Sequence, residues 1–299
     1  MTLQDWRVDT VEGLRLAATF DGDSAIFAAF FSGYDEAFVL PDEKEDEAGF
    51  RRCLALNHGA DHVRLSSSYG PFREVCLVAD DISSGRRIGG ANFIATFHHD
   101  MVTANLNYIY IEKAARGQGA FGRLVSAVSG LIGRIFHTPH SALVFIEQND
   151  PFAMSAEAYA RDTQFTGLDQ FDRLRIWAGR GARVVDHAYV QPPLSAEQAA
   201  DDTLVYSVLG ARDETLSACV LATHLERFFG ISVLKGAPLE SSPTAIAQIE
   251  ALNAACAANQ RIRLFDPQML LSNLKGDAAA RARAEKRYST FRQALRAID

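Results

Sequence analysis

The chain has 299 residues, of which 48% are hydrophobic and 22% are charged. These are ordinary globular proportions, and they exclude a disordered or fibrous protein. The formal net charge of -7 argues against a surface built to bind nucleic acid, which is usually basic. The length predicts one large domain or two domains of ordinary size.

The cysteines and the N-terminal residues indicate in which cellular compartment we expect the protein. Cys53, Cys76, Cys219 and Cys256 are too few and too scattered for a disulfide framework or a metal knuckle, so we expect buried thiols in a reducing compartment. The opening MTLQDWRVDTVEGLRL lacks the basic and then apolar pattern of a signal peptide. Apolar runs stop short of the roughly 20 residues that a membrane span needs. We therefore predict a cytoplasmic protein with no metal, membrane or nucleic-acid partner.

The first hundred residues predict helices followed by an antiparallel meander. Residues 14–20 read as a strand, a helix ending near Gly33 follows, and a second helix opens at Pro41 and stops before Gly59. Short polar turns then separate three runs with strand character. These runs are 74–80, 87–97 and 102–111. Strands joined by such short turns must pair antiparallel.

A strand–helix–strand crossover follows the meander. Residues 120–135 carry an apolar stripe at helical spacing, and residues 142–147 (ALVFIE) form a short apolar strand. A unit of this kind normally places its two strands parallel. The predicted fold is therefore α/β (α+β), with a mixed, mostly antiparallel central sheet and one parallel crossover.

Beyond residue 150 the pattern is less regular. Expected helices lie at 154–161, 173–180 and 215–229, after Pro243 and after Asp277, and expected strands at 182–190, 203–209 and 231–235. The composition changes after Pro193. We place a boundary near 195, which gives a main domain, 1–194, and a smaller C-terminal α/β extension, 195–299, to which we assign no chemistry.

The informative segment lies between the last strand of the meander and the following helix. It reads Arg116, Gly117, Gln118, Gly119, Ala120, Phe121, Gly122. The first N–H groups of a helix lack internal partners and carry partial positive charge. Glycine allows the backbone to approach an anion closely. The segment therefore predicts a cradle for a pyrophosphate.

One interpretation of this cradle is a nicotinamide dinucleotide site. GQGAFG fits the pattern G-x-G-x-x-G, and Glu147 lies near the place of a ribose-binding acid. However, five residues, 112–116, separate the strand from the first glycine, and the upstream strands form an antiparallel meander. An oxidoreductase is therefore the less favoured alternative.

The run from Tyr108 to Phe121, YIYIEKAARGQGAF, resembles the acyl-coenzyme A motif of the GNAT superfamily of N-acetyltransferases. That motif is a strand, a bulged loop and Q/R-x-x-G-x-G/A opening a helix. Arg116 takes the Q/R position and Gly119 takes the glycine position, while Phe121 stands where Gly or Ala is usual. The order of predicted elements over residues 10–192 also matches this superfamily.

The resemblance implies a donor site for acetyl-coenzyme A. The N–H groups of residues 116–122 would hold its pyrophosphate, and the backbone of Tyr110 and Ile111 would pair with the pantetheine arm. Asn149 is similar to an asparagine that touches coenzyme A in this family. An acceptor amine would attack the thioester directly, where the motif strand and the next strand splay apart.

The resemblance also directs the search for the catalytic base and acid. The usual base position falls on Asn105, whose amide cannot take a proton, so Glu147 is the candidate base. The usual tyrosine acid falls on Trp177, so Tyr189, or alternatively Tyr159, is the candidate acid. We predict acetyl transfer to a primary amine of a small molecule. Because Asn105 and Trp177 replace reactive groups, a non-catalytic acyl-coenzyme A sensor or scaffold is the second alternative.

Two further expectations concern the acceptor and the assembly. Residues 150–172 form an insertion rich in aspartate, which we interpret as a cover that attracts a cationic amine. The C-terminal extension could complete the amine pocket or form a homodimer.

Overall fold

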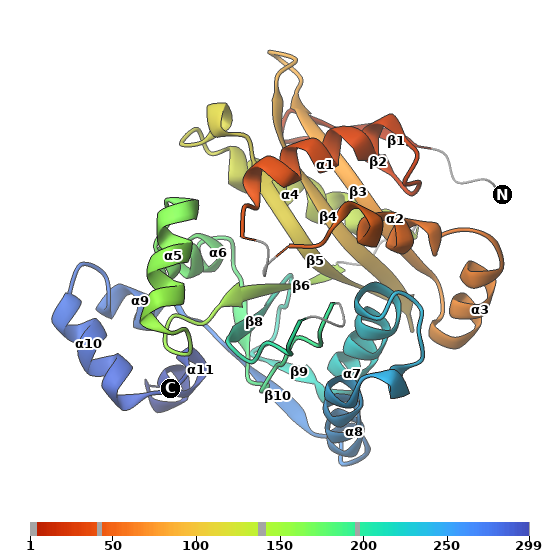
Figure 1. Cartoon of the computed structure of the whole chain (residues 1–299). Coiled ribbons are helices and arrows are strands. Elements are labelled where there is room, and N and C mark those ends of the chain that lie inside the picture. Colours follow the sequence, from red (N-terminus) through yellow and green to blue (C-terminus); the bar gives the residue numbers. More distant parts are fainter. Residues whose placement is uncertain (1–4, 41–43, 137–141, 195–197, 299) are drawn as a thin grey trace. The chain divides into compact units, whose positions relative to one another are not determined.

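The computed structural model describes residues 5–40, 44–136, 142–194 and 198–298 (Figure 1). The chain forms two compact units. The first comprises Met1–Val144 and Glu226–Ser241, and the second comprises Phe145–Leu225 and Ser242–Asp299. These units do not coincide with the predicted domains 1–194 and 195–299, and the assignment of acyl transfer to residues 1–194 stays a prediction.

An antiparallel sheet is the frame of the first unit. Its strands lie in the order of the sequence, β1 (Trp6–Asp9), β2 (Leu14–Thr19), β3 (Phe72–Asp81), β4 (Arg87–His98) and β5 (Met101–Ile111). The predicted meander is therefore confirmed. Strand β1 is an addition, because its four residues are too few to give a readable alternation.

Helices cover both faces of this sheet (Figure 1). They are α1 (Ala25–Ala37), α2 (Glu47–Ala55), α3 (Gly59–Tyr69) and α4 (Ala120–Ile132), with a short 3₁₀ turn, η2 (Lys113–Ala115), before α4. On one face, Phe30 of α1 belongs to the same core cluster as Val78 of β3. On the other face, Phe136, just after α4, stacks on Phe97 of β4 at 5.8 Å. The sheet is thus buried on both sides.

The second predicted helix differs from the observed one. Helix α2 begins at Glu47, where the Asp46 side chain accepts a hydrogen bond from the Gly49 N–H at 2.6 Å. The predicted start at Pro41 lies outside the described residues. Gly59, which we expected to follow a helix, instead begins α3 with a left-handed backbone angle.

A segment from the C-terminal third of the chain belongs to the first unit. This segment, Glu226–Ser241, starts at the last turn of helix α7 (Ala218–Arg227) and contains the π-helix η3 (Phe228–Val233) and η4 (Leu239–Ser241). The predicted strand at 231–235 is wrong, because the Leu234 N–H bonds the Phe229 carbonyl, five residues back, at 2.8 Å. A Cβ on Gly230 would lie 2.5 Å from the Tyr69 hydroxyl, so only glycine allows this close packing.

The second unit contains its own strands, in the order β6-β8-β7-β10-β9. Their bounds are Ala142–Asn149, Leu204–Leu209, Arg183–Val185, Arg261–Phe265 and Thr215–Ser217. The pairs β8–β7, β7–β10 and β10–β9 are antiparallel. Helix α4 connects β5 to β6, and the described strands include one parallel pair, so the predicted mixed, mostly antiparallel fold class is confirmed.

The second unit contains the helices α5 (Ala156–Thr166), α6 (Gln170–Ala178), α8 (Pro243–Ala257), α9 (Gln268–Asn273), α10 (Ala278–Arg287) and α11 (Phe291–Ile298). All of these helices except α8 contribute side chains to one core cluster. Phe171 of α6 and Leu271 of α9 lie in this cluster, with Phe291 of α11. Two helices, α10 and α11, replace the single final helix that we expected. The predicted strand at 182–190 is reduced to the three residues of β7.

The aspartates of the insertion 150–172 hold the fold together. Asp150 accepts hydrogen bonds from the Phe291 N–H, Asp162 pairs with Arg173, Asp169 with Arg281 and Asp172 with Arg175. Burial raises the pKa of Asp150 to about 6, against the lowering effect of its backbone N–H donors. These contacts give the aspartates structural roles. The hypothesis that they attract a cationic amine therefore loses its basis.

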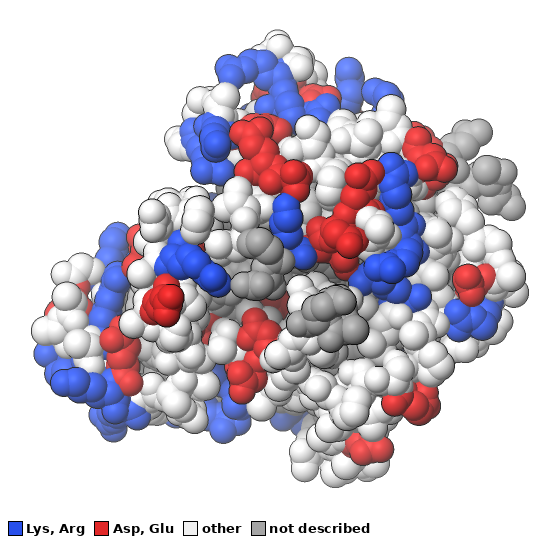
Figure 2. Space-filling model, in the orientation of Figure 1, with Lys and Arg blue, Asp and Glu red and all other residues white. Residues whose placement is uncertain are grey.

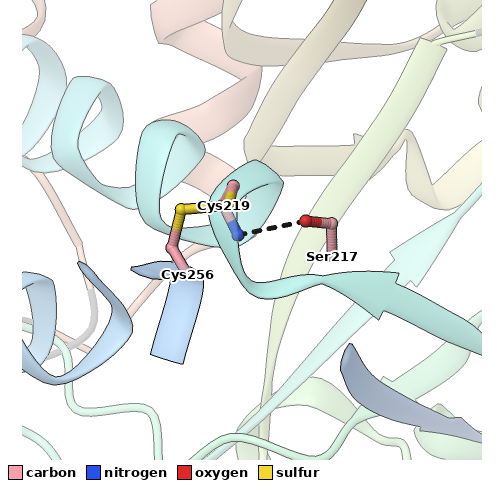
Figure 3. The surroundings of a disulfide bond; sticks show 3 residues. All are labelled: Ser217, Cys219 and Cys256. Atoms are coloured by element: carbon pink, nitrogen blue, oxygen red, sulfur yellow. Dashed lines mark hydrogen bonds between the residues drawn. A yellow bond between two sulfur atoms is a disulfide. The ribbon is translucent and has the colours of Figure 1, made fainter. Parts of the chain in front are cut away.

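A disulfide joins Cys219 of α7 to Cys256 of α8, with the Cα atoms 4.6 Å apart (Figure 3). The expectation of four thiols is therefore wrong for this pair, because helix packing brings together two cysteines 37 residues apart. Cys53 and Cys76 are free and buried, as expected. A cytoplasmic location stays a prediction.

The surface carries charges of both signs. On the face drawn in Figure 2, lysines and arginines alternate with aspartates and glutamates over short distances. Within the described ranges, no helix has the length and apolar character needed to cross a membrane.

We expect the disulfide to stabilise the fold mainly by restricting the unfolded chain. A closed loop of this length lowers the conformational entropy of the unfolded state by an amount equivalent to roughly 4 kcal/mol. A Cys219→Ser, Cys256→Ser double variant should lose about that much free energy of unfolding in urea titrations. Dithiothreitol should lower the free energy of unfolding of the wild-type protein by a similar amount and leave that of the double variant unchanged. If the oxidised wild type and the double variant have the same free energy of unfolding, the disulfide assignment is wrong.

Candidate functional site

The segment between β5 and α4 has the backbone that an anion cradle requires. Gly117 and Gly119 have φ angles of 77° and 71°, in the left-handed region that favours glycine. Gly119 is also the residue that precedes α4, and no side chain caps the helix start. Among the described residues, a Cβ at either glycine would meet no atom within 4 Å. The glycines are therefore required by their backbone angles and leave open space beside the first N–H groups of α4.

Two arginines fix this segment to the sheet. The Nε of Arg116 donates to the carbonyl of Ile111 at 3.2 Å, which ties the loop to the end of β5. Arg123, inside α4, contacts the Asp81 carboxylate at 2.7 Å and the Glu12 carbonyl at 2.9 Å. The Ser83 hydroxyl and then the Arg123 guanidinium hold the pKa of Asp81 well below its usual range.

The side chain of Tyr110 belongs to the core. Its hydroxyl donates to the Phe30 carbonyl at 3.2 Å, and its ring lies against Gly33 and Gly90. A Cβ on Gly33 would lie 2.4 Å from that hydroxyl. Only the backbone of Tyr110 and Ile111 therefore remains for the predicted pairing with a pantetheine arm, and that pairing stays a prediction.

A bulge interrupts the pairing of β5 with β4. Leu106 lies opposite Phe93 and Tyr108 lies opposite Asn92, so Asn107 is an extra residue without a partner on β4. Such a bulge shifts the alternation of side chains along the strand. Asn105 and Tyr108, three residues apart, consequently face the same side of the sheet.

The bulge gathers amide side chains on the face that α1 and α2 cover. The Nδ2 of Asn105 donates to Asn107 at 2.9 Å, and the Nδ2 of Asn107 donates to Asn92 at 3.0 Å. The Nδ2 of Asn107 also lies 3.4 Å from the Ser232 hydroxyl of η3. Asn92 and Asn105 are buried, whereas Asn107 is half-buried. The amide cluster therefore reaches the surface at Asn107.

A carboxyl group that we did not predict lies behind this cluster. Glu74 of β3 is 0% exposed, and in the described part of the chain neither carboxyl oxygen has a hydrogen-bond partner of normal geometry. Burial raises the pKa of Glu74 to about 7, while the nearby Ser232 hydroxyl and the Lys235 ammonium act to lower it. The sequence contained a signal, because Glu74 begins the otherwise apolar run EVCLVA.

An ion pair near Glu74 connects two segments of the first unit. The Nζ of Lys235 lies 2.7 Å from a carboxylate oxygen of Glu45, and both side chains are nearly buried, at 10% and 13% exposed. The N–H of Glu45 in turn donates to the Tyr34 hydroxyl at 2.8 Å. The chain before α2 is thus joined both to α1 and to the segment after η3.

The second unit brings the two predicted catalytic residues together. The Tyr189 hydroxyl donates to the carboxylate of Glu147, and Gln191 also bonds that hydroxyl. The Tyr189 ring stacks on Tyr206, with centroids 4.3 Å apart. The Tyr206 hydroxyl lies 2.8 Å from the Nε2 of His224. The predicted base and acid therefore form one polar group with Tyr206 and His224, in which only Glu147 is partly exposed.

The environment of Tyr189 determines what its hydroxyl can do. Burial raises the pKa of Tyr189 well above its usual value, and the Glu147 carboxylate raises it further. A phenol in this state keeps its proton and donates a strong hydrogen bond to the carboxylate. Tyr189 is therefore suited to hold Glu147 in place.

The structure also shows the burial and hydrogen bonding of the other predicted site residues in the second unit. Tyr159 donates to Asp169 at 2.6 Å, and Trp177 is buried in α6. The Nδ2 of Asn149 is buried, and it has no hydrogen-bond partner in the ranges that the structure describes. An unsatisfied amide donor at the predicted coenzyme A contact is compatible with that role, which stays a prediction. Over the same ranges, no group of three or more His, Cys, Asp or Glu side chains is arranged to hold a metal ion.

The bond between Glu147 and Tyr189 can be measured directly. We expect Glu147→Gln and Tyr189→Phe to show a coupling energy of about 1.5 kcal/mol in a double-mutant cycle, because a hydrogen bond to a charged acceptor is stronger than a neutral one. The measurement is the free energy of unfolding of the wild type, both single variants and the double variant. Strictly additive effects would show that the two side chains do not interact.

No family model matches the chain, and no curated protein matches it in sequence. Solved structures do match. An acetyltransferase assigned to the GNAT family, from Desulfovibrio desulfuricans, has 11% identity and a TM-score of 0.37, over 66% of this chain and 98% of that one. The ribosomal-protein-S18-alanine N-acetyltransferase of Escherichia coli has 15% identity and a TM-score of 0.35, over 65% and 92%.

An aminoglycoside 6'-N-acetyltransferase in complex with coenzyme A is a further match. It has 10% identity and a TM-score of 0.29, over 58% of this chain and 97% of that one. The chain is similar to N-acetyltransferases of the GNAT family.

Proposed function

We propose that the protein is a GNAT-type N-acetyltransferase that moves an acetyl group from acetyl-coenzyme A to a primary amine of a small molecule. The observation that carries this proposal is the backbone of residues 116–122. Two left-handed glycines, Gly117 and Gly119, open α4 without a side-chain cap. The uncapped N–H groups and the helix dipole suit a pyrophosphate.

The direction of β5 supports the same donor. A pantetheine arm that starts at the loop and pairs with Ile111 and Tyr110 would run along β5 toward the bulge. A strand rises about 3.3 Å per residue, so Asn107 lies roughly 13 Å along β5 from Ile111. This length suits an extended pantetheine arm with its thioester near the bulge. The bulge also leaves backbone groups of β5 without partners on β4, and an N–H there could polarise the thioester carbonyl.

The reaction requires two protons to leave the acceptor nitrogen. An ammonium group must first become a neutral amine, which attacks the thioester carbonyl and forms the new C–N bond. As the C–S bond breaks, its electron pair leaves on sulfur, and a second proton passes from nitrogen to the thiolate. Glu147 stays our proposed base, and the hydrogen bond from Tyr189 supports a role for that tyrosine in holding it. Tyr189 as the acid stays a prediction from the sequence.

A specific observation favours a second candidate function. Asn105, at the position where the family usually has its base, donates to Asn107 and cannot take a proton. A protein that binds acyl-coenzyme A as a sensor or scaffold would fit this arrangement. Binding and turnover therefore need separate tests.

Acetyl-coenzyme A should stabilise the folded protein. At a ligand concentration 100 times the dissociation constant, binding adds about 2.7 kcal/mol to the free energy of unfolding, which a thermal melt detects. Gly119→Glu and Arg116→Glu should abolish the shift, because each places a carboxylate beside the pyrophosphate. Arg134→Glu, an equal charge change at an exposed position after α4, is the control and should keep the shift. A wild-type protein without any shift would end the proposal. A shift caused by NADH instead would indicate the oxidoreductase.

Turnover separates the enzyme from the sensor. We expect free thiol to appear when the protein is mixed with acetyl-coenzyme A and a suitable member of a panel of primary amines. The panel should contain spermidine, an aminoglycoside and a peptide with an N-terminal alanine, and a thiol-reactive chromophore follows the release. Binding of acetyl-coenzyme A without amine-dependent release across the panel would favour the sensor or scaffold.

A further inference from the structure

The first unit contains a proton acceptor that the proposed function does not yet use. Glu74 lies on the same face of the sheet as Cys76 and Asn92, because Cys76 is two residues along β3 and pairs with Asn92 of β4. Its carboxyl group is fully buried and has no hydrogen-bond partner of normal geometry among the described residues. Burying an unpaired carboxylate costs free energy. Such a group is unusual in a core that has only a structural role.

A polar path leads from Glu74 toward the surface. The Ser232 hydroxyl is close enough to Glu74 to favour its charged form. The same hydroxyl lies 3.4 Å from the Nδ2 of Asn107, the half-buried extra residue of the β5 bulge. The bulge is the place where the proposed donor would present its thioester. Ser232 therefore neighbours both Glu74 and the bulge, where we expect the attack.

We propose that Glu74, in place of Glu147, takes the first proton from the acceptor ammonium, acting through the hydroxyl of Ser232. This inference rests on the proposed function. The ammonium N–H gives a proton to the Ser232 oxygen, and the Ser232 O–H passes its own proton to the Glu74 carboxylate. The neutral amine then attacks the thioester. The second proton leaves nitrogen for the thiolate. Glu74 returns its proton to solvent by the same path.

The groups around Glu74 suit this role. Titratable side chains near it come from three other parts of the first unit and from β3 itself. They are Cys53 of α2, Glu45 before α2, Lys235 after η3 and Cys76 of β3. Burial raises the pKa values of both thiols, so they stay neutral. Lys235 is paired with Glu45 and lowers the pKa of Glu74, so that Glu74 still ionises near neutral pH.

The proposal has a pH signature. Glu74 has a raised pKa of about 7, so below that pH it already carries the proton and cannot accept another. The rate should therefore fall as the pH falls through about 7. At high pH the acceptor amine loses its proton in solution, and the need for Glu74 disappears.

The test is the pH profile of kcat/KM for Glu74→Gln, with the fastest amine of the panel as acceptor. At pH 7 we expect the rate to fall about 100-fold, the usual effect of losing a positioned proton acceptor. The inflection near pH 7 should vanish, and the gap to the wild type should narrow above pH 9. Ser232→Ala should show the same pattern. Acetyl-coenzyme A should still shift the melting temperature of both variants.

Cys76→Ala is the matched control, because Cys76 is buried two residues along the same strand on the same face, yet its thiol stays protonated and does not titrate at these pH values. It should keep the wild-type inflection. If Glu74→Gln does not fold, Glu74→Asp keeps a carboxylate and should retain the inflection with a lower rate. An unchanged pH profile in Glu74→Gln would overturn the inference, and so would an equal loss at every pH. A wild-type protein that does not bind acetyl-coenzyme A would instead overturn the proposed function.

Discussion

The interruption of the β4–β5 ladder is the constraint on which the candidate site of the first unit depends. One extra residue, Asn107, shifts the alternation of β5 and turns Asn105 and Tyr108 to the same face. Without the bulge, one of these side chains would lie under α4, on the opposite face. The shift places amides beside aromatic rings and breaks the backbone pairing where a thioester would need a free N–H. A local irregularity of the backbone thus creates the polar end of an otherwise apolar layer.

The anion cradle depends on a second backbone feature, the left-handed angles of Gly117 and Gly119. These angles let the chain turn from η2 into α4 and leave the helix N-terminus uncapped. The Arg116 bond to the Ile111 carbonyl fixes the loop to the strand that ends just before it. The cradle therefore follows the end of β5, and the bulge lies within β5. A long donor molecule that binds along the backbone of β5 requires this arrangement.

The surroundings of Glu74 show why a distant segment belongs to the first unit. The residues after α7 contact Cys53 of α2 and Arg64 of α3, and they supply Ser232 and Lys235 to a region that the sheet alone would leave apolar. The π-helical turn of η3 positions Ser232, and widened turns of this kind are frequent at functional sites. In the second unit, stacking on Tyr206 similarly holds Tyr189 against Glu147. In both units a carboxylate depends on neighbours far away in sequence.

The sequence by itself determined the meander, the crossover helix and the glycine loop, because alternation, helical spacing and glycine punctuation are local properties. It also indicated Glu147 and Tyr189 separately. Only the tertiary structure decided that these two side chains are hydrogen-bonded, that Cys219 and Cys256 form a disulfide and that the chain around 231–235 forms the end of a π-helix and a turn rather than a strand. The role of Glu74 likewise required its neighbours, since a glutamate at the start of an apolar run gives no sign of what will bury it. Long-range packing sets burial and pairing, and neither is encoded in the spacing of nearby residues.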